Sequence, residues 1–248
     1  MRVKLLSMSE LSPAFVKELP DKLRQLIEEG FVTSRQVIAL TAIRTCYSHL
    51  YPSEVADKEF EKYFEVAASD GEGGTESDRL FRHIIRSKHT STLEGITYTF
   101  AVEGVSRALL SQLTRHRIGF SFSVQSQRYV RFGSEDKSGG FDYVTPPNIE
   151  RDSETFRKFE ASMLIMQAVY DALREAGVPA EDARMVLPNA ATCNIVLTVN
   201  LRALLEFYGK RRPGSGAQWE IAELADRLRE EVTKIDAWTT KFFEEVSK

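Results

Sequence analysis

Two hydrophobic periodicities alternate along this chain, and their mixture is the feature that most restricts its fold. Residues 95–104 alternate apolar and polar side chains with the period of two that is typical of a β-strand. In residues 152–176 the apolar side chains instead recur every three or four positions, as on one face of a long amphipathic helix. Strands and long helices mixed in one chain predict an α+β fold.

The same patterns predict the remaining elements. Strands are expected at residues 3–6, 120–124 and 191–200, and helices at residues 34–48, 78–89, 105–113 and 217–238. Residues 68–77 and 134–140 are expected to be loops. We expect Ser34 to cap its helix. The helix at 105–113 is expected to continue far enough to place Gln112, Arg115 and His116 on one face.

Composition limits the possible partners. The net charge is −3 and the pI is near 5.9, which argues against a protein that coats nucleic acid or a membrane surface. The only cysteines, Cys46 and Cys193, are too far apart for a metal-binding pair and indicate no disulfide framework. We therefore expect a cytoplasmic protein without a bound metal, and the absence of a run of about 20 apolar residues predicts no membrane span.

Positive charge is nevertheless concentrated in one segment. Between Glu103 and Glu135 there is no acidic residue and no lysine, but there are five arginines: Arg107, Arg115, Arg117, Arg128 and Arg131. Because guanidinium groups bind planar anions with two parallel hydrogen bonds, this segment predicts a local site for a small oxyanion. The alternative is that individual arginines are solvated or are paired with acids elsewhere.

The polar residues after the strand at 120–124 interrupt its alternation. Gln125, Ser126 and Gln127 follow one another, so we expect a bulge or turn that directs Ser126 and Arg128 into the site. No His or Asp stands at a spacing that would activate Ser126 as a nucleophile. Its hydroxyl is better suited to donating a hydrogen bond to phosphate.

These residues also resemble a known family. The sequence RHRIGFSFSVQSQRYV, residues 115–130, is similar to the signature of the flavin-dependent thymidylate synthases, Arg-His-Arg followed by seven residues and Ser. Here eight residues intervene. Four further blocks resemble the family in order: AIRTCYS, HTSTLEGITYTF, DARMVLPNAATCNIVLTVNLRALLEF and AQWEI. Thr90, Gly95 and Glu206 depart from the usual pattern, as does the linker GKRRPGSG.

The resemblance implies a reaction and an assembly. Members of the family methylate dUMP to dTMP with methylenetetrahydrofolate as the carbon donor and FAD, reduced by NADPH, as the hydride source. The fold implied is a central, mostly antiparallel sheet flanked by long helices, with residues 1–248 forming one domain. The assembly implied is a homotetramer with active sites between subunits, and neither nucleic acid nor membrane is a partner.

Site residues follow from the matching positions. Those implied for dUMP are Gln112, Leu113, Thr114, Arg115, Val124, Gln125, Ser126, Gln127, Arg128 and Arg184. Those implied for FAD are His89, Ser91, Arg115, His116, Arg117, Asn200, Arg202 and Glu206. The extra residue before Ser126 leaves open whether Val124 or Gln125 takes the family's Glu/Gln position.

A further arginine is expected to stabilise negative charge on the uracil ring. Counting back from Ala217 gives Arg212, which we favour, and counting forward from Asn200 gives Arg211.

Two further expectations complete the interpretation. Because the flavin route needs no enzyme thiolate, Cys46 and Cys193 are predicted to be small packing residues. The alternative function is a non-catalytic nucleotide or RNA binder in which Tyr129 and Phe132 stack on bases.

Overall fold

The computed structural model describes residues 1–247, and the chain divides into two compact units. Unit 1 comprises residues 1–4, 101–117 and 122–197. Unit 2 comprises residues 5–100, 118–121 and the remainder of the described chain from residue 198. The expectation of a single domain over residues 1–248 stays a prediction.

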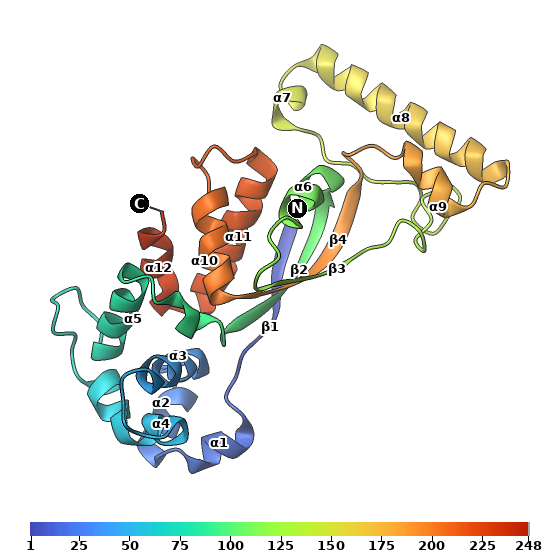
Figure 1. The fold of residues 1–248 in the computed structure, drawn as a ribbon. Helices are drawn as coiled ribbons and strands as arrows, with labels where there is room; N and C mark the ends of the chain where they lie inside the picture. The colour runs from blue at the N-terminus through green and yellow to red at the C-terminus, as the bar shows by residue number, and fades with distance from the viewer. Residues whose placement is uncertain (248) are drawn as a thin grey trace. The chain divides into compact units, whose positions relative to one another are not determined.

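A four-stranded sheet runs in the order β1-β2-β4-β3, with each strand supplying residues to both units. The strands are β1 (Arg2–Met8), β2 (Thr97–Ser106), β3 (Phe120–Val124) and β4 (Thr192–Asn200) (Figure 1). All four predicted strands are therefore confirmed, with β1 and β2 extending beyond their expected ends.

Neighbouring strands are antiparallel, as expected. In each pair, a residue at the end of one strand contacts a residue at the start of the other, so the two strands run in opposite directions. The contacts are Ser9 N to Thr97 O, Gly104 N to Asn194 Oδ1 and Asn200 N to Gly119 O, each at 3.0 Å. With its helices, the sheet makes the α+β fold that the periodicities predicted.

Unit 1 contains the longest helix of the described chain. Its helical elements are α6 (Arg107–Leu113), α7 (Pro147–Glu150), α8 (Ser153–Glu175), α9 (Ala180–Ala183) and the 3₁₀ turn η3 (Arg184–Val186). Helix α8 begins where the Asp152 carboxylate accepts a hydrogen bond from Thr155 N at 2.8 Å, an N-cap that satisfies a free amide. Figure 1 shows α9 next to the C-terminal part of α8.

The apolar stripe of α8 forms part of the unit 1 core. Met163 and Tyr170 are buried, and Tyr170 packs with Phe132 and Ala183. The other apolar members of the stripe are half-buried, and Leu173 among them packs against the same cluster.

Unit 2 contains the remaining helices. They are α1 (Pro13–Glu18), α2 (Asp21–Glu28), α3 (Ser34–Thr45), α4 (Pro52–Phe60), the π-helical turn η1 (Glu61–Glu65), α5 (Glu76–Arg86), the 3₁₀ turn η2 (Thr90–Leu93), α10 (Leu201–Arg211), α11 (Trp219–Ile235), the 3₁₀ turn η4 (Ala237–Thr239) and α12 (Thr240–Glu245). The core of unit 2 includes an aromatic group in which Trp238 lies 5.0 Å from Phe81 and 5.3 Å from Phe242, measured between ring centroids.

Two details of the sequence prediction are wrong. Ser34 is the first residue of α3, and Thr33 caps it, because the Thr33 hydroxyl accepts from Gln36 N while the Gln36 side chain accepts from Thr33 N. Helix α6 ends at Leu113, so Arg115 and His116 lie beyond it and do not share a helical face with Gln112.

A buried carboxylate connects four segments of unit 2. Asp236, fully buried, accepts hydrogen bonds at one oxygen from Arg35 Nε (2.7 Å) and the Tyr98 hydroxyl (2.8 Å), and at the other from Trp238 Nε1 (2.9 Å). The Arg35 guanidinium also donates to Ser9 O at 3.2 Å. Burial, together with the Asp236 charge, raises the pKa of Tyr98 well above its usual value, so the phenol stays a donor. Both oxygens of the buried carboxylate therefore have donors.

Within residues 1–247, no helix combines the length and apolarity that a membrane span requires. The same residues contain no group of three His, Cys, Asp or Glu side chains arranged to hold a metal ion.

The buried carboxylate generates a stability prediction. Asp236→Ala should lower the free energy of unfolding by about 3 kcal/mol, because it leaves the buried Arg35 guanidinium with only the exposed Glu10 carboxylate as an ion-pair partner. Urea denaturation followed by circular dichroism measures the change. As a control, Asp226→Ala removes a surface pair with Arg229 and should cost less than about 1 kcal/mol. Equal losses for the two variants would contradict the role given to Asp236.

Candidate functional site

The arginine-rich segment in unit 1 forms a strand followed by a turn. Side chains of β3 alternate between half-buried and exposed, with Ser121 and Ser123 on the exposed face, as predicted. The strand ends at Val124, and Val130 N then donates to Ser126 O at 3.0 Å, which closes a turn. The Ser126 hydroxyl accepts from Arg128 N at 3.1 Å. The predicted break after Gln125 is therefore a turn, and Ser126 stabilises it locally.

Arg107 and Asn194 hold the start of this turn. Arg107 Nη2 donates to Gln125 O at 2.9 Å, and Asn194 Nδ2 donates to Gln125 Oε1 at 3.3 Å. Among residues 1–247, the buried Arg107 Nε has no hydrogen-bond partner. Arg107 was one of the five clustered arginines but not a predicted ligand residue, and its contacts show that it positions the backbone of Gln125.

Arg128 and Arg184 meet at one glutamate. Arg128 Nε lies 2.6 Å from a Glu181 carboxylate oxygen, and Arg184 Nε donates to the Glu181 carbonyl at 3.0 Å. The structure thus brings together two predicted dUMP residues 56 positions apart in the sequence. The Glu181 carboxylate pairs with Arg128 and the Glu181 carbonyl with Arg184, so the pairing with acids raised as an alternative applies to Arg128.

The other predicted dUMP residues lie in unit 1 as well. Gln112 is half-buried, and Leu113 is fully buried inside α6. The Thr114 hydroxyl donates to Leu110 O at 2.9 Å and ends the helix. Arg115 is exposed, and Val124 and Gln127 are half-buried.

The two aromatic residues of the segment differ in environment. Tyr129 is 79% exposed, with the Arg128 guanidinium 5.5 Å from its ring centroid. Phe132, in contrast, is buried in the unit 1 core, and its backbone N donates to the Tyr170 hydroxyl at 3.3 Å. The prediction that Phe132 could stack on a base is wrong, because packing against α8 occupies its ring.

A second group of predicted residues lies in unit 2 at the start of α10. Asn200 caps this helix, its Oδ1 accepting from Ala203 N at 2.8 Å. Gly119 approaches it closely: a Cβ on Gly119 would lie 2.6 Å from both Asn200 Nδ2 and Ala203 Cβ. Gly119 also has φ +73, which glycine adopts without strain. Glycine is therefore required here for the chain to turn past Asn200.

Arg202 is held by two carboxylates. Its Nη1 donates to Glu94 at 2.6 Å and its Nε donates to Glu206 at 3.1 Å. Glu206, followed by Glu94, raises the pKa of Arg202, so the guanidinium stays charged while its charge is balanced locally.

Arg202 and Glu206 line a hollow of about 540 Å³ in unit 2. Its lining comes from the end of α5, the segment around Thr90, helix α10 and the end of α12: Ile85, Arg86, Lys88, Thr90, Arg202, Leu205, Glu206, Gly209, Lys210, Glu245 and Val246. Sequence reasoning missed Lys88 and Lys210 as lining residues. The signal available for Lys88 was its place directly before the predicted His89.

Two motif blocks that are separate in the sequence meet at His89. The Tyr47 hydroxyl lies 2.9 Å from His89 Nδ1, and the two rings pack edge to face with centroids 5.8 Å apart. Tyr47 belongs to the AIRTCYS block and was not predicted as a site residue. Ser91, next to this pair, is exposed, whereas the predicted residues Arg117 (exposed) and His116 (half-buried) belong to unit 1.

The candidate activating arginines lie at the end of α10. Arg211 is the last residue of the helix and is half-buried. Arg212 follows it, and its guanidinium donates to the Ser247 carbonyl. Within the described residues its Nε is buried without a hydrogen-bond partner.

The cysteines have different environments. Cys193 is fully buried in β4, as predicted for a packing residue. Cys46 is exposed, so the same prediction is wrong for it: α3 ends one residue earlier and leaves Cys46 at its solvent-facing C-cap.

Comparison with known proteins relates the whole arrangement to one family. The family model described as "Thymidylate synthase complementing protein" matches residues 25–236. A flavin-dependent thymidylate synthase of Geobacter sulfurreducens is 41% identical over 188 residues, which cover 76% of this chain and 72% of that protein. The enzyme of the same name from Clostridium tetani is 33% identical over 225 residues, covering 83% of this chain and 80% of the relative.

Solved structures resemble the fold. A UMP/dUMP methylase, PolB from Streptomyces cacaoi, bound with 5-Br dUMP, has a TM-score of 0.68 at 20% identity, covering 98% of this chain and 94% of that one. The flavin-dependent thymidylate synthase ThyX of Helicobacter pylori, complexed with FAD and dUMP, has a TM-score of 0.64 at 23% identity and covers 99% of both chains.

Crowding at Gly119 generates a second prediction. Gly119→Ala should lower the free energy of unfolding by at least about 2 kcal/mol, because left-handed strain is added to a clash with Asn200 and Ala203. Gly139→Ala is the matched control: Gly139 has φ +68, but a Cβ there would meet nothing within 4 Å, so the change should cost about 1 kcal/mol. Thermal and urea unfolding of both variants tests this, and indistinguishable losses would show that crowding at Gly119 is unimportant.

Proposed function

The chain belongs to the flavin-dependent thymidylate synthase family, and on that basis we propose that it converts dUMP to dTMP. Methylenetetrahydrofolate would supply the carbon, and NADPH would reduce the bound FAD. The observation that supports this most is the family match across residues 25–236, which includes the arginine-rich turn, the start of α10 and the whole of α11.

The residues in unit 2 fit an anionic flavin nucleotide. FAD would be held by Arg202 and Thr90, which line the hollow, and by Asn200 at the start of α10; the cationic lining of the hollow suits a diphosphate. When bound and reduced, FAD supplies the hydride that completes the methyl group. His89 fits the same set, because its contact with Tyr47 fixes the orientation of its ring. Arg115, His116 and Arg117 remain proposed FAD residues on the strength of the motif.

The dUMP phosphate is assigned to the arginines of unit 1. Arg128 contacts the Glu181 carboxylate and Arg184 contacts the Glu181 carbonyl, so a phosphate that displaces the carboxylate from Arg128 would lie near the residue that both guanidinium groups contact. Arg107 and Asn194 fix Gln125 beside this turn, so the amide side chain of Gln125 is held for the nucleotide. Gln112, Arg115 and Ser126 complete the proposed set.

The ring-activating residue is proposed to be Arg212, with Arg211 as the alternative. Carbon C5 of uracil is a poor nucleophile unless negative charge developing at N3, C4 and O4 is stabilised. A fixed guanidinium would provide that stabilisation. The contact of the Arg212 guanidinium with the Ser247 carbonyl would hold it in a fixed position.

A homotetramer is proposed from the surface of α8. Leu164, Ile165 and Val169 are 72%, 64% and 42% exposed on a helix whose opposite side packs in the core. Apolar side chains exposed together on one helix are typical of an interface. A second copy of this chain would cover them, in keeping with active sites formed between subunits.

One of the two observations that favoured the RNA-binding alternative does not hold in the structure. It required both Tyr129 and Phe132 as stacking platforms, and Phe132 is buried. Location in the cytoplasm and use of NADPH as the reductant stay predictions.

Turnover by arginine variants tests the proposed function. Anaerobic incubation of FAD-loaded protein with NADPH, dUMP and methylenetetrahydrofolate should yield dTMP. Arg212→Ala should lower kcat by about 100- to 1,000-fold, since a donor to developing charge is lost. Arg211→Ala is the matched control and should retain most activity. A reversed result would identify Arg211 as the activating residue, and wild-type turnover in both variants would remove the charge-stabilisation mechanism.

The contact between Arg128 and Glu181 generates a separate binding prediction. Arg128→Ala should weaken dUMP binding by at least about 10-fold, because a charged hydrogen bond to phosphate is lost. Glu181→Gln should strengthen it by about 3-fold, because the competing carboxylate becomes neutral. Isothermal titration with dUMP and with deoxyuridine, which lacks the phosphate, separates the two effects. Unequal deoxyuridine binding by the variants would show that they act on something other than the phosphate.

A further inference from the structure

We infer that Lys88, together with Lys210, forms a binding site for the phosphate or carboxylate groups of an anionic ligand in the unit 2 hollow. This inference deepens the proposed function and rests on it to the extent that Arg202 and Glu206, which line the same hollow, are proposed FAD residues. Neither lysine belongs to the residues that the family resemblance implied.

The backbone at Lys88 is of a kind that glycine normally adopts. Helix α5 ends with Lys88 N donating to Ile85 O at 3.1 Å and His89 N donating to Ile84 O at 3.0 Å, the pair of bonds of a Schellman motif. Such a motif places its C′ residue in the left-handed region, and Lys88 has φ +60, the only positive φ outside glycine among the described residues. Lysine is less favourable there than glycine, and this is the first observation that points to a role for the Lys88 side chain.

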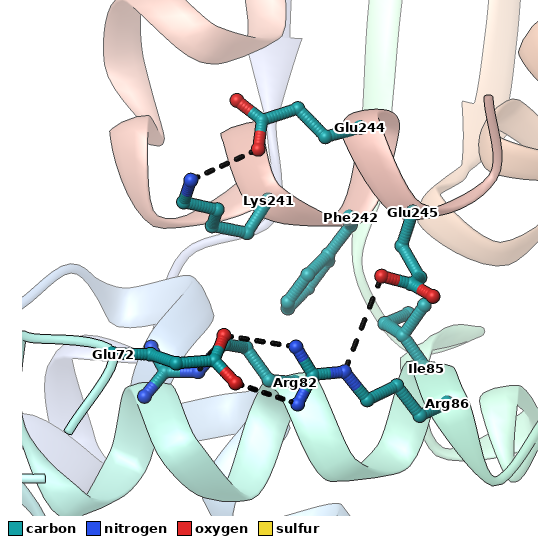
Figure 2. Close-up of a pocket in the computed structure, with 8 residues that line it drawn as sticks. All are labelled: Glu72, Arg82, Ile85, Arg86, Lys241, Phe242, Glu244 and Glu245. Carbon is teal, nitrogen blue, oxygen red and sulfur yellow. Dashed lines mark hydrogen bonds and ion pairs between the residues drawn. The ribbon is translucent and has the colours of Figure 1, made fainter. Parts of the chain in front are cut away.

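The other cations of the hollow are already paired. Arg86 donates to both carboxylate oxygens of Glu72, at 2.9 and 2.8 Å, and Figure 2 shows its guanidinium directed at Glu72 with Glu245 on its other side. Arg202 is paired with Glu94 and Glu206.

Lys88 and Lys210 differ from these arginines. Both are exposed, and no carboxylate within residues 1–247 forms an ion pair with either ammonium group. They come from different elements, the end of α5 and the last turn of α10, and they line one hollow. These two lysines therefore supply the positive charge of the hollow that is not balanced by a carboxylate. Arg202, which lines the same hollow, is balanced by its two glutamates.

The hollow suits a ligand that has both an apolar part and a charged part. Ile85 and Leu205 provide apolar wall, and Thr90 provides a hydroxyl. Two ligands of the proposed reaction have this character: the diphosphate of FAD, and a folate whose glutamate tail ends in carboxylates. Compact ammonium groups on flexible stems bind either group as point charges.

The test compares variants of the two lysines in the full-length protein. Lys88→Gly removes the charge and relieves the backbone, so it should raise Tm while weakening binding of pyrophosphate about 5- to 10-fold in calorimetry. Lys210→Gln should weaken pyrophosphate binding by a similar factor without raising Tm. Lys88→Arg keeps the charge and should bind as the wild type does. Lys17→Gln, which removes an exposed charge on α1, is the control and should change neither quantity.

Two further arms distinguish the sources of the anion. If the site serves FAD, Lys88→Gly weakens FAD binding and leaves riboflavin binding unchanged, as measured by flavin fluorescence. If it serves folate, the variant raises KM for pentaglutamyl methylenetetrahydrofolate and leaves KM for the monoglutamyl form unchanged. In either case, 1 M salt should remove the difference in binding or KM between the variant and the wild type. At that concentration the Debye length is about 3 Å, so the lysine charge is screened from the ligand.

The pyrophosphate arm does not depend on turnover. If Lys88→Gly and Lys210→Gln bind pyrophosphate as tightly as the wild type and neither source arm changes, the inference is overturned even if dTMP is formed. If dTMP is not formed but both variants lose pyrophosphate affinity, the anion site stands and the proposed function fails.

Discussion

The buried Asp236 carboxylate is the interaction on which the arrangement of unit 2 depends. A charge removed from water is costly unless a counter-charge and hydrogen bonds replace the solvent. Asp236 obtains these from Arg35 at the start of α3, Tyr98 on β2 and Trp238 after α11. Because Arg35 and Tyr98 come from distant parts of the chain, satisfying one carboxylate joins β2 and α3 to the end of α11.

Two arginines of the candidate site, Arg128 and Arg202, are balanced by nearby carboxylates. Arg128 is paired with Glu181 and Arg202 with Glu94, so both acquire a distant acid in the folded chain, and Arg202 also pairs with Glu206 one turn further along α10. A guanidinium paired near the surface is held in place at small energetic cost, and an incoming phosphate can replace the carboxylate. Such pairing keeps a cationic site ordered before the ligand arrives. The two lysines of the unit 2 hollow contribute charge that is not balanced in this way.

Much of the fold was predictable because periodicity reports directly on burial. All four strands and the long helix α8 followed from it, and the turn after Val124 followed from the break in alternation. Prediction failed where a contact spans the sequence. Phe132 was expected to face a ligand, but α8, which begins 21 residues later, covers it. A local boundary caused a separate failure: Cys46 was expected to pack, but the helix ends one residue before it and leaves it in solvent. The pairing of Asp236 with Arg35, 201 residues away, had no local signal.

The sequence by itself determined the fold class, the family resemblance and the residue types available for anion binding, because periodicity and ordered motifs are local properties of the chain. Only the tertiary structure decided which of those residues are neutralised, which are buried and which share a hollow. Arg202 with Glu94, Arg128 with Glu181, and Lys88 with Lys210 are each brought together by the folding of separate elements. Electrostatic interaction falls with distance and with screening, so the effect of a charge depends on neighbours that only the folded chain supplies.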